Sequence, residues 1–97
     1  MTAESVPGTL QQLVEKMQRE YKQSEMDIAV TLANEDGAVS TDDLAEQTGY
    51  TERTVRKRVG TLEEQLRGPP LLQRTEDDAP FLHPELARAI READAGE

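Results

Sequence analysis

The stretch of sequence that follows Gly49 holds four basic side chains and one acidic one: Arg53, Arg56, Lys57, Arg58 and Glu52. Four positive charges and one negative charge give this stretch a local charge of +3, whereas the whole chain carries a formal net charge of −9. Guanidinium and ammonium groups bind phosphate oxygens, and exposed residues near the start of a helix can reach base edges in the major groove of DNA. The stretch therefore indicates nucleic-acid chemistry. Taken alone, a basic run is more often a solvated helix face, so the case depends on the elements around it.

Residue types that serve catalysis are sparse and poorly placed. The only histidine, His83, stands directly before Pro84 at the predicted start of a helix, where a capping or surface role is expected. Acidic neighbours occur in three pairs: Asp42-Asp43, Glu63-Glu64 and Asp77-Asp78. Adjacent side chains diverge, whereas acid–base catalysis needs carboxylates that converge in a cleft. With no cysteine and no glycine-rich phosphate loop, the sequence predicts no enzyme, no cofactor and no metal site.

Two predicted helices and a turn position the basic stretch. Thr51 is the expected N-cap of the longer helix. An apolar stripe runs along the other face of this helix, at offsets of four, three and four residues: Val55, Val59, Leu62 and Leu66. Thr41 is expected to cap the shorter helix before it, with Leu44 and Ala45 in the contact between the helices and Gly49 at the corner. This spacing is typical of a helix-turn-helix.

Apolar periodicity also predicts two helices in the N-terminal third of the chain. The first runs from about Leu10 to Lys22, with Thr9 as its N-cap. The second is capped by Ser24, with Asp27 three residues further on in the manner of a capping box, and it ends near Asn34 at a turn signal.

Short apolar runs and proline punctuation predict the remaining elements. Gly68-Pro69-Pro70 cannot continue a helix, and the runs LLQRT and PFLH beyond it are expected to pair as a β-hairpin. Pro84 suits the first turn of a last helix. The predicted fold is mostly α with a small β-hairpin wing: a winged helix-turn-helix with an extra N-terminal helix and a C-terminal helix. The expected division is a flexible N-terminus (1–8) and a single domain (9–95) with an N-terminal helix (9–22), a core (24–83) and a C-terminal helix (84–95).

The stretch from about Gly37 to Pro84 resembles the winged helix-turn-helix domain of LysR-type and ModE-type regulators. The resemblance rests on the run AVSTDDLAEQTGYTERTVRKRVGTLEEQL followed by PLLQRT. Two features depart from it: the turn Arg67-Gly68-Pro69-Pro70 is longer than usual, and the wing tip Glu76-Asp77-Asp78 is acidic where related proteins often carry Gly and Arg. The effector domain of LysR-type proteins is missing, so ligand sensing is not implied. What the resemblance implies is a DNA-binding transcriptional regulator.

On this prediction, eight residues contact double-stranded DNA: Thr51, Glu52, Arg53, Thr54, Arg56, Lys57, Arg58 and Arg74. Those from Glu52 to Lys57 face the major groove, because they lie at the N-terminal end of the reading helix. Arg58 lies nearer the flank, and Arg74, at the end of the first wing strand, is expected to contact a phosphate. Tyr50, in the turn, either packs against the core or faces a phosphate, and we favour packing.

The charge of the whole chain opposes this prediction. Twenty acidic residues against eleven basic ones repel a polyanion if the charge is averaged over the surface. Few of the basic residues are lysine and the acids are spread along the chain, a composition that resembles the proteins of halophilic archaea, in which local charge matters more than net charge. The alternative prediction is a winged-helix adaptor that binds a partner protein and not DNA.

A homodimer is expected, because a single half-site contact seldom gives enough specificity. The expected dimer surface comprises Leu10, Leu13, Val14, Met17 and Tyr21, with Leu86 and Ile90 as further members. The alternative, weighted equally, is that this stripe completes the core of a monomer, and a mixed arrangement of the two is also open. No apolar run approaches the roughly 20 residues of a membrane helix and no signal-peptide pattern opens the chain, so a cytoplasmic location without membrane contact is expected.

Overall fold

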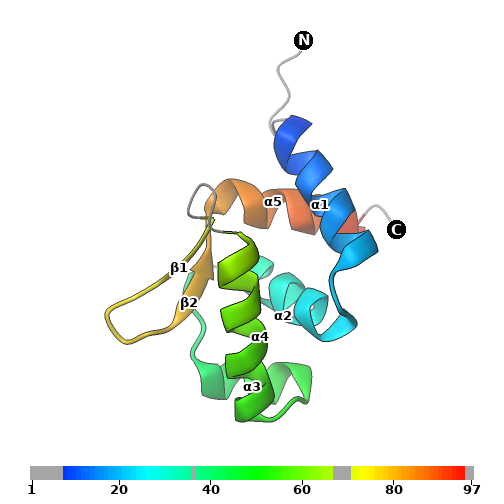
Figure 1. Ribbon diagram of the computed structural model, residues 1–97. Helices are drawn as coiled ribbons and strands as arrows, with labels where there is room; N and C mark the ends of the chain where they lie inside the picture. Colours follow the sequence, from blue (N-terminus) through cyan, green and yellow to red (C-terminus); the bar gives the residue numbers. More distant parts are fainter. Residues whose placement is uncertain (1–7, 36, 67–70, 96–97) are drawn as a thin grey trace.

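The computed structural model describes residues 8–35, 37–66 and 71–95. These residues form five helices and one two-stranded antiparallel sheet (Figure 1). In chain order the elements are α1 (Gly8–Glu20), α2 (Gln23–Ala33), α3 (Thr41–Thr48), α4 (Glu52–Gln65), β1 (Leu72–Arg74), β2 (Pro80–Leu82) and α5 (Pro84–Ala95). The predicted fold class, mostly α with a small β-hairpin and additional helices at both ends, is confirmed. Within these ranges no helix has the length and apolar character needed to cross a membrane.

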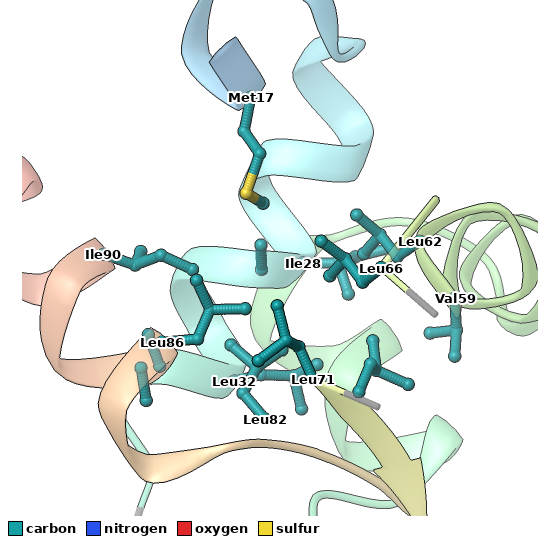
Figure 2. Packing of buried hydrophobic residues seen from close by; sticks show 14 of the residues in the cluster. Met17, Ile28, Leu32, Val59, Leu62, Leu66, Leu71, Leu82, Leu86 and Ile90 are labelled. Carbon is teal, nitrogen blue, oxygen red and sulfur yellow. The ribbon is translucent and has the colours of Figure 1, made fainter. Parts of the chain in front are cut away.

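Helix α2 occupies the centre of the fold. It packs against α3, α4, α5 and β2, and its Ile28 and Ala29 are fully buried. Figure 2 shows side chains of α1, α2, α4, α5 and the hairpin converging on one cluster, to which Leu44 of α3 also belongs. Since the chain has one Phe and no Trp, aliphatic side chains fill this core. The candidate reading helix α4 is thus held against the same central helix as α3, α5 and β2.

The apolar stripe of α1 completes the core of the single chain. α1 packs against α5, and Val14 and Met17 of α1 belong to the same buried cluster as Leu86 and Ile90 of α5. Figure 2 shows Met17, Leu86 and Ile90 in this cluster. All four side chains are at most 2% exposed. The prediction that they form a dimer surface is therefore wrong, and the alternative of a completed monomer core holds for them. The other members of the predicted surface are only partly buried: Leu10, Leu13 and Tyr21.

Helix α1 begins and ends earlier than the sequence suggested. It starts at Gly8, a residue assigned to the flexible terminus, so that Thr9 lies inside the helix and is not its N-cap. Its last residue is Glu20, not Lys22. Residues 1–7, the rest of the predicted flexible terminus, lie outside the described part of the chain.

Helix α2 begins at Gln23, and Ser24 is not its N-cap. The backbone N–H of Lys22 donates instead to the Glu25 carboxylate at 3.1 Å. Glu has the longer side chain needed to reach back from the third helical position, which Asp lacks. Asp27, the residue predicted to complete the cap, is left free for contacts elsewhere.

The hairpin forms where the sequence predicted it. β1 and β2 pair in the register Leu72↔Leu82, Gln73↔Phe81 and Arg74↔Pro80, which directs both leucines of the first pair into the core. A backbone hydrogen bond of 3.1 Å from the Val39 N–H to the Pro80 carbonyl ties the segment before α3 to β2. The predicted break at residues 68–70 lies outside the described ranges.

Candidate nucleic-acid interface

A tight corner joins α3 to α4. Gly49 ends α3 with a φ of 85°, a left-handed conformation that favours glycine. Its N–H donates to the Ala45 carbonyl at 2.9 Å. Thr51 then caps α4, because its Oγ1 accepts the Thr54 N–H at 3.1 Å. The predicted corner and the predicted cap of α4 are both confirmed.

The cap of α3 differs from the prediction by one residue. Thr41 is the first residue of the helix, and the side chain of Ser40 accepts the Asp43 N–H at 3.2 Å. Both serine and threonine are favoured N-cap residues, serine slightly more so, and the choice here follows from where the chain leaves the extended conformation. The hydrogen bond from Val39 to β2 holds the chain extended up to Ser40.

Helix α4 has one buried face and one exposed face. The predicted apolar stripe is buried, each member at most 2% exposed: Val55, Val59, Leu62 and Leu66. Arg53, Arg56 and Lys57 are exposed, and their spacing of three and four residues places them along one strip of the helix surface. We call these three residues the basic strip. Of the remaining predicted site residues at this end of α4, Thr51 and Glu52 are exposed and Thr54 is partly buried.

Two carboxylates adjoin the basic strip at the start of α4. Glu52 accepts a 3.3 Å ion-pair contact from Arg56, both side chains being largely exposed. The carboxyl of Asp42, in the first turn of α3, lies near Glu52 and raises the pKa of Glu52 above its usual value, because the two groups can share a proton and two negative charges there would repel. Exposed ion pairs of this kind contribute little energy, so Arg56 remains free to exchange Glu52 for a phosphate or a base edge.

Arg58 lies apart from the basic strip. It is partly buried, and its Nε is shielded from solvent without an acceptor among the described residues. The pKa of Tyr50 is raised, chiefly by a hydrogen bond to Asp27, and the positive charge of Arg58 offsets part of this increase. The predicted flanking position of Arg58 thus brings it toward the corner between α3 and α4.

The guanidinium of Arg74 is already engaged. Its Nη2 and Nε donate to one oxygen of Glu63 at 3.0 and 3.2 Å, and its Nη1 donates to Asp78 at 3.3 Å. These acceptors raise the pKa of Arg74, and its side chain is only 29% exposed. Contact with a phosphate would require Arg74 to exchange at least one of these partners, so its charge is less available than that of the basic strip.

The wing tip is a closed turn with three exposed carboxylates: Glu76, Asp77 and Asp78. The Thr75 N–H donates to the Ala79 carbonyl at 3.0 Å, and the Thr75 hydroxyl accepts the N–H groups of Asp77 and Ala79, each at 3.2 Å. Asp78 takes a left-handed φ of 67°. Since β1 packs against α4 and Arg74 links Asp78 to Glu63 of α4, the hairpin lies beside the C-terminal half of that helix.

Sequence reasoning missed the polar contacts between residues far apart in the chain. The Tyr50 hydroxyl donates to Asp27 on α2 at 2.5 Å, and this bond raises the pKa of Tyr50. The favoured prediction of packing over phosphate contact is compatible with this placement. A separation of 23 residues leaves no local signal for such a pair.

His83 caps the last helix. Its Nδ1 accepts the Glu85 N–H at 3.1 Å, which confirms the capping role expected from its position before Pro84. Within the described ranges, no three His, Cys, Asp or Glu side chains come together in an arrangement that could hold a metal ion.

Comparison with the models of known families, with curated proteins and with solved structures gives no match to this chain. The proposed function therefore rests on the geometry of α3, α4 and the hairpin.

Proposed function

We propose that the chain is a transcriptional regulator that reads double-stranded DNA in the major groove with the N-terminal half of α4. The observation that carries the proposal is the exposure of Arg53, Arg56 and Lys57 on one strip, opposite a fully buried stripe. A helix of this kind fits the major groove, where arginine binds guanine in a bidentate manner and lysine binds guanine or phosphate. The exposed N-terminus of α4 adds unpaired N–H groups and a partial positive charge.

The packing around α4 supports the proposal. α3 and α2 both contact α4, so the basic strip is carried by a helix whose orientation is set by two others. Such rigidity favours base reading, because side chains on a fixed helix lose less freedom on binding. We further propose a homodimer that acts in the cytoplasm, with Leu10, Leu13 and Tyr21 as contact residues, since these three remain partly exposed.

DNA binding is tested by fluorescence anisotropy of a labelled duplex of mixed sequence, titrated over a range of KCl concentrations that extends to molar salt. The logarithm of the binding constant should fall linearly with the logarithm of salt, by about 0.9 for each phosphate contacted. Lys57→Gln is expected to reduce this slope by about 1. The matched control is Lys16→Gln, which removes an exposed lysine from α1. Absence of binding at every salt concentration, or equal effects of the two variants, would contradict the proposal.

A specific observation favours a second function, that of a protein-binding adaptor. Asp42 and Glu52 adjoin the basic strip, and the acidic wing tip belongs to the hairpin that lies beside α4. These carboxylates repel phosphates, whereas an acidic segment of a partner protein could avoid them more easily than a continuous duplex. The adaptor function predicts no salt-dependent DNA binding and retention of a partner that Lys57→Gln releases.

We expect neutralisation of the acidic wing tip to raise DNA affinity at low salt only. At about 0.1 M salt the Debye length is about 10 Å, which leaves repulsion between phosphates and the three wing-tip carboxylates largely unscreened; at 1 M it is about 3 Å. The triple variant Glu76→Gln, Asp77→Asn, Asp78→Asn is compared with the parent by the same anisotropy titration. An equal gain at both salt concentrations would contradict the electrostatic explanation, and no change at either would place the wing away from DNA.

A further inference from the structure

A hollow of about 610 Å³ opens along α2, between the end of α1 and the end of α3. This volume lies within the range of roughly 300–1,000 Å³ that is typical of small-molecule sites. The apolar part of its surface comes from Met26, Val30 and Ile90, and amide side chains surround it from three helices: Gln18, Gln23 and Gln47. No basic residue and only one acidic residue, Asp27, belong to the described lining. We call this hollow the α2 groove.

Asp27 is an unneutralised carboxylate in the α2 groove. Its Oδ1 accepts a hydrogen bond from Gln23 Nε2 at 2.8 Å and its Oδ2 accepts the Tyr50 hydroxyl at 2.5 Å. Both donors are uncharged, and among the described residues no Lys or Arg forms an ion pair with Asp27. Each oxygen of a carboxylate has room for a second hydrogen bond. A cation that enters the groove would therefore find an acceptor that no other positive charge occupies.

The amides of the α2 groove add neutral hydrogen-bonding groups around this carboxylate. The side chains of Gln18 and Gln47 are exposed and make no hydrogen bond with another described residue. Each offers both a donor and an acceptor to a bound molecule. The combination of one carboxylate, free amides and an apolar base selects for a ligand with a single positive charge on a small apolar body, and against anions.

We propose that the α2 groove binds a small organic cation, an alkylammonium with an apolar body, whose charged group contacts Asp27 and whose body lies on Met26 and Val30. This site is separate from the basic strip of α4 and holds whether or not the chain binds DNA. Because Asp27 also accepts the Tyr50 hydroxyl, a bound cation shares the carboxylate that anchors the corner before α4 and weakens the hydrogen bond from Tyr50. A resulting effect on DNA affinity is a consequence that rests on the proposed function.

The test uses cyclohexylammonium chloride as the probe and the full chain without DNA, at constant ionic strength. At a ligand concentration ten times the dissociation constant, mass action should raise the Tm by about 7 °C. For so small a ligand the dissociation constant is on the order of 1 mM. Cyclohexanol, which has the same body without the charge, should bind at least about tenfold more weakly, since charge-assisted hydrogen bonds are the stronger ones. In a Tyr21→Phe variant Tyr50 is the only tyrosine. Its emission is quenched by the hydrogen bond to the Asp27 carboxylate and should increase saturably as a bound cation weakens that bond.

Two variants that each remove one negative charge locate the site. Asp27→Asn should raise the dissociation constant about tenfold, whereas Asp43→Asn, on the exposed surface of α3, should leave it unchanged. Equal effects of the two variants, equal binding of cyclohexanol, or no saturation would overturn the proposal. If Asp27→Asn fails to fold, the comparison of cyclohexylammonium with cyclohexanol in the parent decides alone. The groove could instead bind a second copy of the chain. In that case the parent should sediment as a dimer, Val30→Glu should dissociate it, and the probe should have no effect. This result would also overturn the proposal.

Discussion

Replacement of Arg53 or Arg56 with alanine is expected to weaken specific DNA binding by about 1–3 kcal/mol, the cost of a lost bidentate contact with a base. Both side chains are exposed on α4, so the Tm should stay nearly unchanged. The measurement is anisotropy with an operator selected from a random pool, together with a repeated selection for each variant. Loss of a base contact should also relax the preference at one position of the site.

The matched control is Arg88→Ala on α5. Arg88 pairs with Glu92 at 3.2 Å, much as Arg56 pairs with Glu52 at 3.3 Å, and all four side chains are about half exposed or more. The two substitutions therefore remove a similar surface ion pair, but only one of them lies on the basic strip. If Arg53→Ala and Arg56→Ala bind the operator as tightly as the parent and Arg88→Ala do, α4 is not the reading helix.

Replacement of Val55 with aspartate should unfold the domain. Val55 is 0% exposed in the contact of α4 with the rest of the core, among side chains that are almost all apolar. Burial of an unpaired charge belongs to the substitutions that cost more than about 4 kcal/mol, a large share of the roughly 5–15 kcal/mol that stabilises a small domain. Circular dichroism should show loss of helix at 25 °C or a strongly lowered Tm.

Two controls separate burial of charge from loss of a side chain on α4. Lys57→Asp introduces the same carboxylate on the exposed face of the same helix and should leave the fold intact. Arg58→Ala should also preserve stability, because the Nε that it removes has no acceptor among the described residues. A Tm for Val55→Asp close to that of Lys57→Asp would show that the α3–α4 contact is not as described.

Features that depend on neighbours within about four residues were predictable from the sequence. Thr51 caps α4, Gly49 takes the left-handed conformation at the corner, and Val55 with the rest of its stripe is buried. In each case the helical period or one local hydrogen bond decides the outcome. The exposure of the basic strip follows from the same period, since burial of one face of α4 leaves the other to solvent.

The capping residues of α2 and α3 could not be predicted from local sequence alone. Ser24 and Thr41 are good capping residues, yet Glu25 and Ser40 make the bonds instead. Several residues at each of these starts could cap, with energies that differ by less than about 1 kcal/mol. The path that the chain takes into the helix selects among them, and that path is set by contacts such as the one between Val39 and β2.

Tertiary structure alone decided which side chains meet across the fold. Arg74 binds Glu63, 11 residues away, and Tyr50 binds Asp27, 23 residues away. The guanidinium of Arg74 is therefore less available to a phosphate, and the hydroxyl of Tyr50 is anchored to α2. The sequence left open whether the apolar stripe of α1 forms a dimer surface or part of a monomer core. Packing of α1 on α5 buries Met17 within the monomer. The physical reason is common to all three: a sequence pattern defines which face of an element is apolar or charged, but only the packing of elements determines what that face contacts.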